Sequence, residues 1–361
     1  MASYDPFRGL TSGSKLMVAF SGGIDSAVAA YLCKKAGYQV EAVNMQLLSN
    51  APDNKDKIQL VADKLDIPLH FIDCVQDFKQ NIMYYCWQEF DRGRTPNPCA
   101  VCNPLFKFGR LIQFARERNC HGFVTGHYAQ ILPEKDTEKG FRLYRGTHRL
   151  KDQSYFLFGL KAEQIAYTYM PLGDMNKDEI RKIAAELQLP NSENPESQDA
   201  CFAPESGSLA EMLREMFCGQ KRCGKFIESG TGKVLGDHQG IHAYTIGQRK
   251  GTGVAVGKPI YVKKICPETQ IIELTTDSNL LEQTTLYLSR PNFLSTHYAG
   301  LQRFRADVQI RYRSKAAAAW ITILDSDHIQ VDFDEPQRAV TPGQAAVFYV
   351  EDSLIGGAWI D

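Results

Sequence analysis

The chain has 361 residues, a formal net charge of −1, 43% hydrophobic residues and 23% charged residues. This composition is ordinary for a folded globular protein, and it excludes a disordered chain, a collagen and a disulfide-stabilised miniprotein. No apolar run approaches the ~20 residues of a membrane span, and the N-terminus lacks the basic and apolar regions of a secretory signal. We therefore expect a cytoplasmic protein without membrane contact, whose ten cysteines are reduced thiols, metal ligands or catalytic groups.

The first half of the chain alternates expected strands with expected helices. Buried-strand composition is found in residues 15–20, 38–46, 68–73 and 123–131. Helical patterns lie between them, in residues 27–36, 54–65, 77–90 and 104–119. Such alternation predicts an α/β fold with a doubly wound parallel sheet covered by helices on both faces. Asn176 and Glu179 have capping-box spacing and predict one further helix before a loop at residues 190–198.

The second half changes to short strands. Those expected first are residues 225–228, 242–246, 259–264 and 269–274. The alternating residues 305–313 then precede further expected strands at 320–324, 328–333, 344–350 and 354–360. This spacing predicts a small central β-rich domain followed by a C-terminal antiparallel β-barrel.

Two basic segments are hidden by the near-zero net charge. Residues 139–151 contain five Lys or Arg residues and no acidic residue, and residues 303–315 contain five against one Asp. Basic patches on an otherwise acidic body can orient a polyanion such as RNA. A solvated charged face is the alternative interpretation.

The hexapeptide Ser-Gly-Gly-Ile-Asp-Ser at residues 21–26 joins the first expected strand to the first expected helix. Two glycines let the backbone come close to a ligand, and a helix N-terminus adds partial positive charge. Ser21 and Ser26 can donate to phosphate oxygens, and Asp25 can hold a hydrated Mg²⁺. Since no Gly-Lys-Ser/Thr follows, the sequence predicts a phosphate loop that is not a Walker A loop.

Cys99 and Cys102 form a Cys-x-x-Cys in a proline-rich stretch, and Cys201 lies at the end of the same expected domain. We expect Pro104 to begin the next helix, whose N-terminus would lower thiol pKa values nearby. The other cysteines are expected to be inert or incidental: Cys33, Cys74, Cys86, Cys120, Cys218, Cys223 and Cys266.

Several of these motifs resemble known families. The hexapeptide resembles the pyrophosphate loop of the ATP pyrophosphatases. Thr-Pro-Asn-Pro-x-x-x-Cys-Asn at residues 95–103 resembles a landmark of the tRNA-specific 2-thiouridylases, and further landmarks follow in family order at residues 125–128, 151–155, 197–202 and 245–251. The resemblance implies an adenine nucleotide α-hydrolase-like fold, with a catalytic domain at residues 1–205 and tRNA-contacting domains at 206–275 and 276–361.

The resemblance also implies an activity. ATP would adenylate the C2 oxygen of the wobble uridine in tRNAs of the Lys, Glu and Gln type, and sulfur would replace that oxygen to give 2-thiouridine. Cys201 would carry a persulfide received from a sulfur-relay protein or a cysteine desulfurase. Cys102 would then close a disulfide with Cys201, which a cellular reductant opens.

The family's site residues map onto this sequence in three groups. ATP and Mg²⁺ are assigned to Ala19, Phe20, Ser21, Gly22, Gly23, Ile24, Asp25, Ser26, Met45 and Gly126. The extruded target base is assigned to Asn97, Pro98 and Cys99. Other tRNA contacts are assigned to His127, Lys151, Asp152, Gln153, Arg311, Tyr312 and Gln344.

Cys99 departs from the family pattern, in which an Asp stands near the catalytic cysteine. Cys99, Cys102 and Cys201 could then ligate a 4Fe-4S (Fe-S) cluster with one open iron, as an alternative to persulfide chemistry. Two other functions also stay open at this point. One is an amide- or C–N-forming ligase of the ATP pyrophosphatase superfamily, which needs no cysteine pair, and the other is a non-enzymatic RNA-binding protein.

Overall fold

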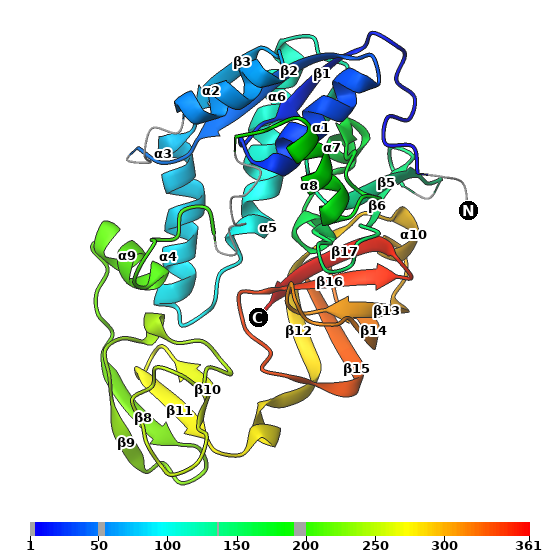
Figure 1. Cartoon of the computed structure of the whole chain (residues 1–361). Helices are drawn as coiled ribbons and strands as arrows, with labels where there is room; N and C mark the ends of the chain where they lie inside the picture. Colours follow the sequence, from blue (N-terminus) through cyan, green and yellow to red (C-terminus); the bar gives the residue numbers. More distant parts are fainter. Residues whose placement is uncertain (1–3, 50–54, 136, 191–199) are drawn as a thin grey trace.

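The computed structural model describes residues 4–49, 55–135, 137–190 and 200–361. The chain forms three bodies (Figure 1). They are a parallel sheet with its helices, a small four-stranded sheet and a closed barrel. The three-part fold expected from the sequence is thus confirmed. Within the described ranges, no helix is both long and apolar enough to cross a membrane.

The parallel sheet has its strands in the order β3 (Leu69–Asp73), β2 (Gln39–Gln46), β1 (Lys15–Ala19), β4 (Gly122–Val124) and β7 (Thr168–Tyr169). The chain leaves β1 toward β2 on one side and returns to β4 on the other. The carboxyl ends of β1 and β4 therefore form a topological switch point, where sheets of this type bind ligands.

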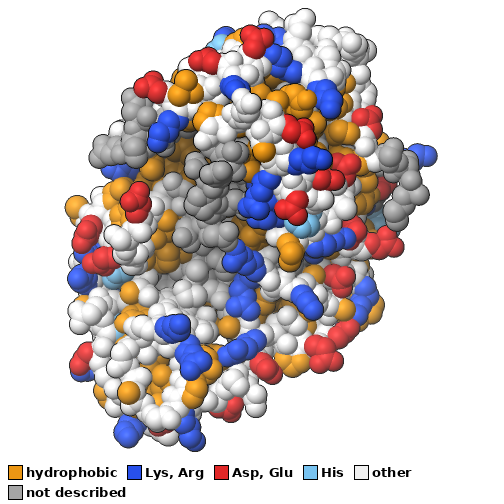
Figure 2. Space-filling view, viewed as in Figure 1, with side chains coloured by type: hydrophobic (Ala, Val, Ile, Leu, Met, Phe, Trp, Pro, Cys, Tyr) orange, Lys and Arg blue, Asp and Glu red, His pale blue; other side chains and the backbone are white. Residues whose placement is uncertain are grey.

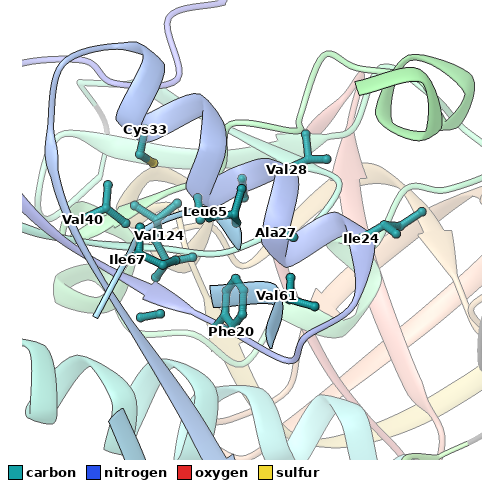
Figure 3. Packing of buried hydrophobic residues seen from close by; sticks show 14 of the residues in the cluster. Phe20, Ile24, Ala27, Val28, Cys33, Val40, Val61, Leu65, Ile67 and Val124 are labelled. Atoms are coloured by element: carbon teal, nitrogen blue, oxygen red, sulfur yellow. The ribbon is translucent and has the colours of Figure 1, made fainter. Parts of the chain in front are cut away.

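Helices cover both faces of this sheet. α1 (Ile24–Lys35), α2 (Lys55–Lys64) and α8 (Lys177–Glu186) bury one face, on which Leu16 and Val18 of β1 lie. Figure 3 shows Phe20, Val28 and Leu65 among the side chains of this cluster. Met17 points to the other face and packs in a second cluster with Phe108. Alternate residues of β1 are thus buried on opposite faces, as a central parallel strand requires.

Two long helical segments run beside the second face. The first comprises α3 (Val75–Phe78), the π-helix η1 (Lys79–Met83) and α4 (Tyr84–Asp91). The second comprises α5 (Pro98–Cys102), the π-helix η2 (Asn103–Arg110) and α6 (Leu111–Glu117).

The expectation that Pro104 begins the second of these helices was wrong. The helix begins at Pro98, and the Asn97 side chain caps it by accepting from the Ala100 N–H. A proline inside an α-helix lacks a donor and clashes with the preceding turn. Here the chain widens into a π-helix at Pro104, and the Gln164 side-chain amide donates to the carbonyls of Pro104 and Phe108, each at 2.8 Å.

The expected strand at residues 123–131 is two strands in two different sheets. β4 ends at Val124, whereas β5 (Ala129–Pro133) forms a hairpin with β6 (Phe141–Arg145), and β6 pairs with β17 of the barrel. The turn at residues 125–128 separates them, and a continuous apolar run cannot reveal such a turn. η3 (Ser154–Leu157) and α7 (Ala162–Ala166) complete the connection to β7.

The central body consists of β8 (Gly224–Glu228), β9 (Val234–His238), β10 (Tyr261–Cys266) and β11 (Ile271–Thr275), after α9 (Leu209–Met216). The expected strand at residues 242–246 was wrong, and β9 was missed. Ile241–Ala243 forms the 3₁₀ helix η4, whose buried His242 lies 2.8 Å from the Glu211 carboxylate of α9. That packing against α9 decides the local conformation.

The barrel has six antiparallel strands: β12 (Glu282–Phe293), β13 (Arg303–Gln309), β14 (Ala317–Ile323), β15 (His328–Arg338), β16 (Ala345–Val350) and β17 (Ser353–Ile360). η5 (Ser278–Leu281) precedes it and α10 (Thr296–Ala299) follows β12. β12 pairs with both β15 and β17, which closes the barrel. The strand expected at 305–313 ends at Gln309, so Arg311 and Tyr312 lie in the turn beyond it.

Candidate active site

The phosphate loop occupies the carboxyl end of β1. Gly22 has a φ of +77°, and a Cβ there would lie 2.8 Å from the Ile58 side chain, so only glycine fits. The Ser26 hydroxyl donates to the Gly23 carbonyl at 2.9 Å, and the Ser21 N–H donates to that hydroxyl. α1 begins at Ile24, earlier than expected, so Asp25 and Ser26 belong to its first turn.

Lys177 is a site residue that the sequence analysis missed. Its ammonium lies 2.7 Å from Asp25 Oδ1, and the Tyr128 hydroxyl donates to the same oxygen at 2.7 Å. The Lys177 side chain is 5% exposed and the Asp25 side chain 35% exposed. A buried ammonium therefore lies directly beside the phosphate loop. The capping box predicted α8, but no local signal shows that α8 begins next to α1.

The turn after β4 packs on the first turn of α1. A Cβ on Gly126 would lie 2.9 Å from the Asp25 carbonyl carbon, so this close approach requires glycine. His127 is buried, and its Nδ1 lies 2.7 Å from the Thr125 hydroxyl. Burial, reinforced by the charge of Lys107, holds the pKa of His127 well below its usual value. The imidazole is therefore neutral.

A hydrophobic cluster links the nucleotide edge of the sheet to the cysteines. Met45, near the end of β2, packs both with the cluster on the second sheet face and with the cluster that contains Cys102. In the latter cluster, the Phe202 and Phe78 rings pack edge to face, with centroids 5.5 Å apart. Since Phe202 directly follows Cys201, this contact docks the Cys201 segment against the helices that flank Cys102.

Cys99, Cys102 and Cys201 are close enough to influence one another's ionisation. Negative charge on Cys201 or Cys99 raises the pKa of Cys102, and charge on Cys99 raises that of Cys201. Cys99 and Cys102 lie one turn apart on α5; Cys102 is buried, whereas Cys99 and Cys201 reach the surface. The structure thus brings the three thiols to one side of the body that contains the parallel sheet.

The expected lowering of thiol pKa values was wrong for this conformation. Burial raises the pKa of Cys102 to about 12. Desolvation by the surrounding protein also raises the pKa values of Cys99 and Cys201. The Lys107 ammonium opposes this shift at all three thiols. Desolvation therefore outweighs the helix N-terminus and the nearby cation.

The π-helix explains how Lys107 comes to act on Cys102. Residues five apart lie on different faces of an α-helix. The wider π-helix, with its i→i+5 hydrogen bonds, brings such residues toward the same face. Because η2 begins directly after Cys102, the π-helical turn favours proximity of the ammonium to the thiol. No pattern in the sequence predicts a π-helix at this position.

The residues assigned to tRNA differ in accessibility. Arg311 and Cys99 are exposed, and Pro98, Lys151, Gln153, Tyr312 and Gln344 are half-buried. Asn97, His127 and Asp152 are buried. The Asp152 carboxylate accepts from the Gly146 and Ser154 N–H groups and pairs with Arg145 at 3.0 Å, so it organises the segment after β6. Lys and Arg side chains border the central hollow of the molecule (Figure 2).

Three segments that carry or adjoin the assigned tRNA contacts are joined to one another at this edge. The Gln153 N–H donates to the Tyr128 carbonyl, and the Gln153 side chain accepts from the Tyr128 N–H at 3.1 Å. Tyr312 stacks on Phe156 with ring centroids 4.5 Å apart. The segments around residues 128, 153 and 312 therefore form one continuous surface beside the switch point.

The chain matches three domain families in succession. These are the tRNA methyl transferase HUP domain over residues 14–205, the tRNA methyl transferase PRC-barrel domain over 213–275 and the Aminomethyltransferase beta-barrel domain over 283–360. The tRNA-specific 2-thiouridylase MnmA of Carboxydothermus hydrogenoformans is 38% identical over 96% of this chain and 97% of its own length. That of Rippkaea orientalis is 39% identical over 96% and 99%.

The chain belongs to the tRNA-specific 2-thiouridylase (MnmA) family. The family resemblance seen in the sequence is thereby confirmed. A solved 4-thiouridine synthetase–RNA complex with bound ATP is similar at 18% identity, covering 57% of this chain and 50% of its own, with a TM-score of 0.36.

The Fe-S alternative stays a prediction for this MnmA-family chain. Among the residues that the structure describes, no three His, Cys, Asp or Glu side chains are disposed to hold a metal ion. Cys99, Cys102 and Cys201 are among these described residues.

The raised pKa of Cys102 predicts a steep pH dependence of its reactivity. Because the pKa is about 12, alkylation of Cys102 by iodoacetamide should accelerate about tenfold per pH unit between about pH 7 and 10. Replacing Lys107 by Met removes the opposing charge and should slow the reaction at each pH, whereas Lys107→Arg should preserve it. Mass spectrometry of each cysteine measures these rates. A plateau below about pH 9 would contradict the prediction.

Proposed function

We propose that this protein is an ATP-dependent tRNA sulfurtransferase that converts the wobble uridine to 2-thiouridine. One observation supports this above others: the segments of Cys102 and Cys201 dock together beside the sheet edge that holds the phosphate loop. A ligase that forms C–N bonds has no use for such a pair of thiols. The curated relatives are 2-thiouridylases over nearly the whole chain.

The first step is activation of the uracil carbonyl. The C2 oxygen attacks the α-phosphorus of ATP. The bond between the α-phosphorus and the oxygen that bridges it to the β-phosphorus breaks, and pyrophosphate leaves. The loop at residues 19–26, with Met45 and Gly126, binds the nucleotide. Lys177 neutralises charge on the departing pyrophosphate, and Mg²⁺, when bound at Asp25, shields the phosphates.

The second step moves sulfur. The terminal sulfur of a Cys201 persulfide attacks C2, and AMP leaves with the former C2 oxygen. The Cys102 thiolate then attacks Cys201 Sγ, which forms the Cys102–Cys201 disulfide and leaves the pair of electrons on the sulfur now bound to C2. A cellular dithiol reduces the disulfide. Exposed Cys201 suits reception of sulfur from a donor protein, whereas buried Cys102 suits the internal step.

Cys99 stands beside both thiols in this scheme. Its pKa, raised by its surroundings, keeps it largely protonated. A neutral S–H at this position can donate a hydrogen bond to the reacting groups from the position where the family has an Asp. No iron is needed for any of these steps.

The tRNA lies across the basic border of the hollow. Lys151, Arg311, Gln153 and Tyr312 contact it, and Asn97, Pro98 and Cys99 surround the extruded base, since C2 is hard to reach within a stacked anticodon. Buried His127 and Asp152 shape this surface from below, together with Gln344, which donates to the carbonyls of Thr95 and Pro96. tRNAs of the Lys, Glu and Gln type are the proposed acceptors.

The three domains have separate proposed roles. Residues 1–205 form the catalytic domain, and residues 206–275 and 276–361 form the two tRNA-contacting domains. The sulfur comes from a relay protein or a cysteine desulfurase. The reaction takes place in the cytoplasm, where its disulfide is readily reduced.

One assay tests the function. The protein is incubated with ATP, Mg²⁺, unmodified tRNA, a dithiol and a cysteine desulfurase with cysteine, and the tRNA is digested and analysed for 2-thiouridine by mass spectrometry. We expect 2-thiouridine and a stoichiometric release of pyrophosphate. Pyrophosphate without thiolated uridine would favour a ligase, and the absence of both would favour an RNA-binding protein.

A further inference from the structure

The linker at residues 92–97 joins α4 to α5 and leads directly into the cysteine pair. Its backbone is held by the barrel. The Thr95 N–H donates to the Pro342 carbonyl at 2.9 Å, and the Arg94 guanidinium donates to the Ile360 carbonyl at 3.0 Å. The Gln344 side-chain amide donates to the carbonyls of both Thr95 and Pro96, each at 3.0 Å.

The central body holds the same linker from another side. The Thr95 and Thr245 hydroxyls lie 3.0 Å apart, and Arg222 pairs with Asp91 at 3.1 Å just before the linker. A Cβ on Gly93 would lie 2.6 Å from the Ile265 side chain. All three bodies therefore meet at this short stretch of backbone.

The linker ends on the residue that caps the cysteine helix. Asn97 accepts from the Ala100 N–H at 3.3 Å, and its side chain lies near enough to the Tyr155 hydroxyl to oppose the rise that burial causes in the pKa of that phenol. That hydroxyl donates to the barrel carbonyl of Ala345 at 2.9 Å. A series of polar contacts thus runs from the start of β16 to the first turn of α5, which carries Cys99 and Cys102.

We propose that Gln344 is a positioning residue for the catalytic cysteines, acting through the 92–97 linker, and that the linker couples tRNA engagement by the barrel and central body to the placement of Cys102. Both amide hydrogens of Gln344 have carbonyl partners in the linker, so its side chain serves the linker directly. Gly343 fits the same role, because a Cβ there would lie 2.8 Å from the Thr95 carbonyl oxygen.

The test compares Gln344→Ala with Arg311→Ala and with Gln337→Ala, whose side chain donates to the barrel carbonyl of Glu335. The first readout is iodoacetamide alkylation of Cys102 in the full chain without tRNA or ATP, followed by mass spectrometry with exposed Cys218 as internal reference. Loss of two hydrogen bonds that hold the linker should accelerate Cys102 alkylation on the order of tenfold in Gln344→Ala. Arg311→Ala and Gln337→Ala should leave it unchanged.

The second readout separates positioning from direct contact. Gln344→Ala should lower kcat for thiolation by a larger factor than it weakens tRNA binding, whereas Arg311→Ala should mainly weaken tRNA binding and reduce its salt dependence. Gln344→Lys, which keeps donors for both carbonyls, should restore slow alkylation. Unchanged alkylation in Gln344→Ala together with weaker tRNA binding would overturn the proposal.

The kcat readout rests on the proposed function, but the alkylation readout does not. If the protein forms no 2-thiouridine at all, faster alkylation of Cys102 in Gln344→Ala still supports the positioning role. Thermal unfolding of each variant checks that a changed rate reflects the linker and not global instability.

Discussion

Replacing Cys201 or Cys102 by Ser should reduce formation of 2-thiouridine by at least about 1,000-fold while pyrophosphate release with tRNA continues. A serine hydroxyl cannot accept a persulfide at Cys201, and at Cys102 it cannot break the bond between Cys201 and the transferred sulfur. Mass spectrometry of digested tRNA and a pyrophosphate assay on the same samples separate the two steps.

The matched control is Cys223→Ser, which alters an exposed thiol of the central body and should keep wild-type turnover. Without a reductant, the wild-type protein should stop after one turnover and contain the Cys102–Cys201 disulfide in proportion to the thiolated tRNA. Full activity of Cys102→Ser would be incompatible with the disulfide step and would favour the ligase interpretation.

Replacing Lys177 by Met should slow pyrophosphate release by about 100- to 1,000-fold, the usual effect of removing one group that stabilises developing charge. The buried ammonium is 2.7 Å from Asp25 in the phosphate loop, and methionine preserves its length without its charge. Asp25→Asn should also be slow, because it removes the carboxylate that holds both Lys177 and the proposed Mg²⁺. Pyrophosphate release in the presence of tRNA is the measurement.

Lys182 on the same helix is exposed, so Lys182→Met is the control and should react like the wild type. Lys177→Arg should retain part of the rate, since the charge remains. If Lys177→Met released pyrophosphate normally but unfolded at a lower temperature, the Asp25–Lys177 pair would be structural only.

The sequence predicted those parts of the site that lie on single local segments. Residues 21–26 bend between β1 and α1 because Gly22 alone tolerates a φ of +77°, and a two-glycine turn at a strand–helix junction signals this locally. The alternation of apolar and polar segments likewise predicted a parallel sheet and a barrel. In both cases the information lies in neighbouring residues.

Predictions failed where distant contacts decide local conformation. Pro104 looks like a helix start, but Asn97 caps the helix earlier and the chain passes Pro104 in a π-helix, where Gln164 donates to the carbonyls of Pro104 and Phe108. The thiol pKa was expected to fall at a helix N-terminus, yet burial among residues of four separate segments raises it. Neither Gln164 nor the burial of Cys102 can be read from the residues beside them.

By itself, the sequence determined the class of fold and the family, and it pointed to the proposed phosphate loop and catalytic cysteines, because each of these depends on residues close together in the chain. Only the tertiary structure decided that Lys177 reaches Asp25, that Lys107 acts on three thiols and that the barrel holds the linker before Cys102. These are pairings between residues far apart in sequence. Their energies depend on distance and burial in space, which the folded chain alone sets.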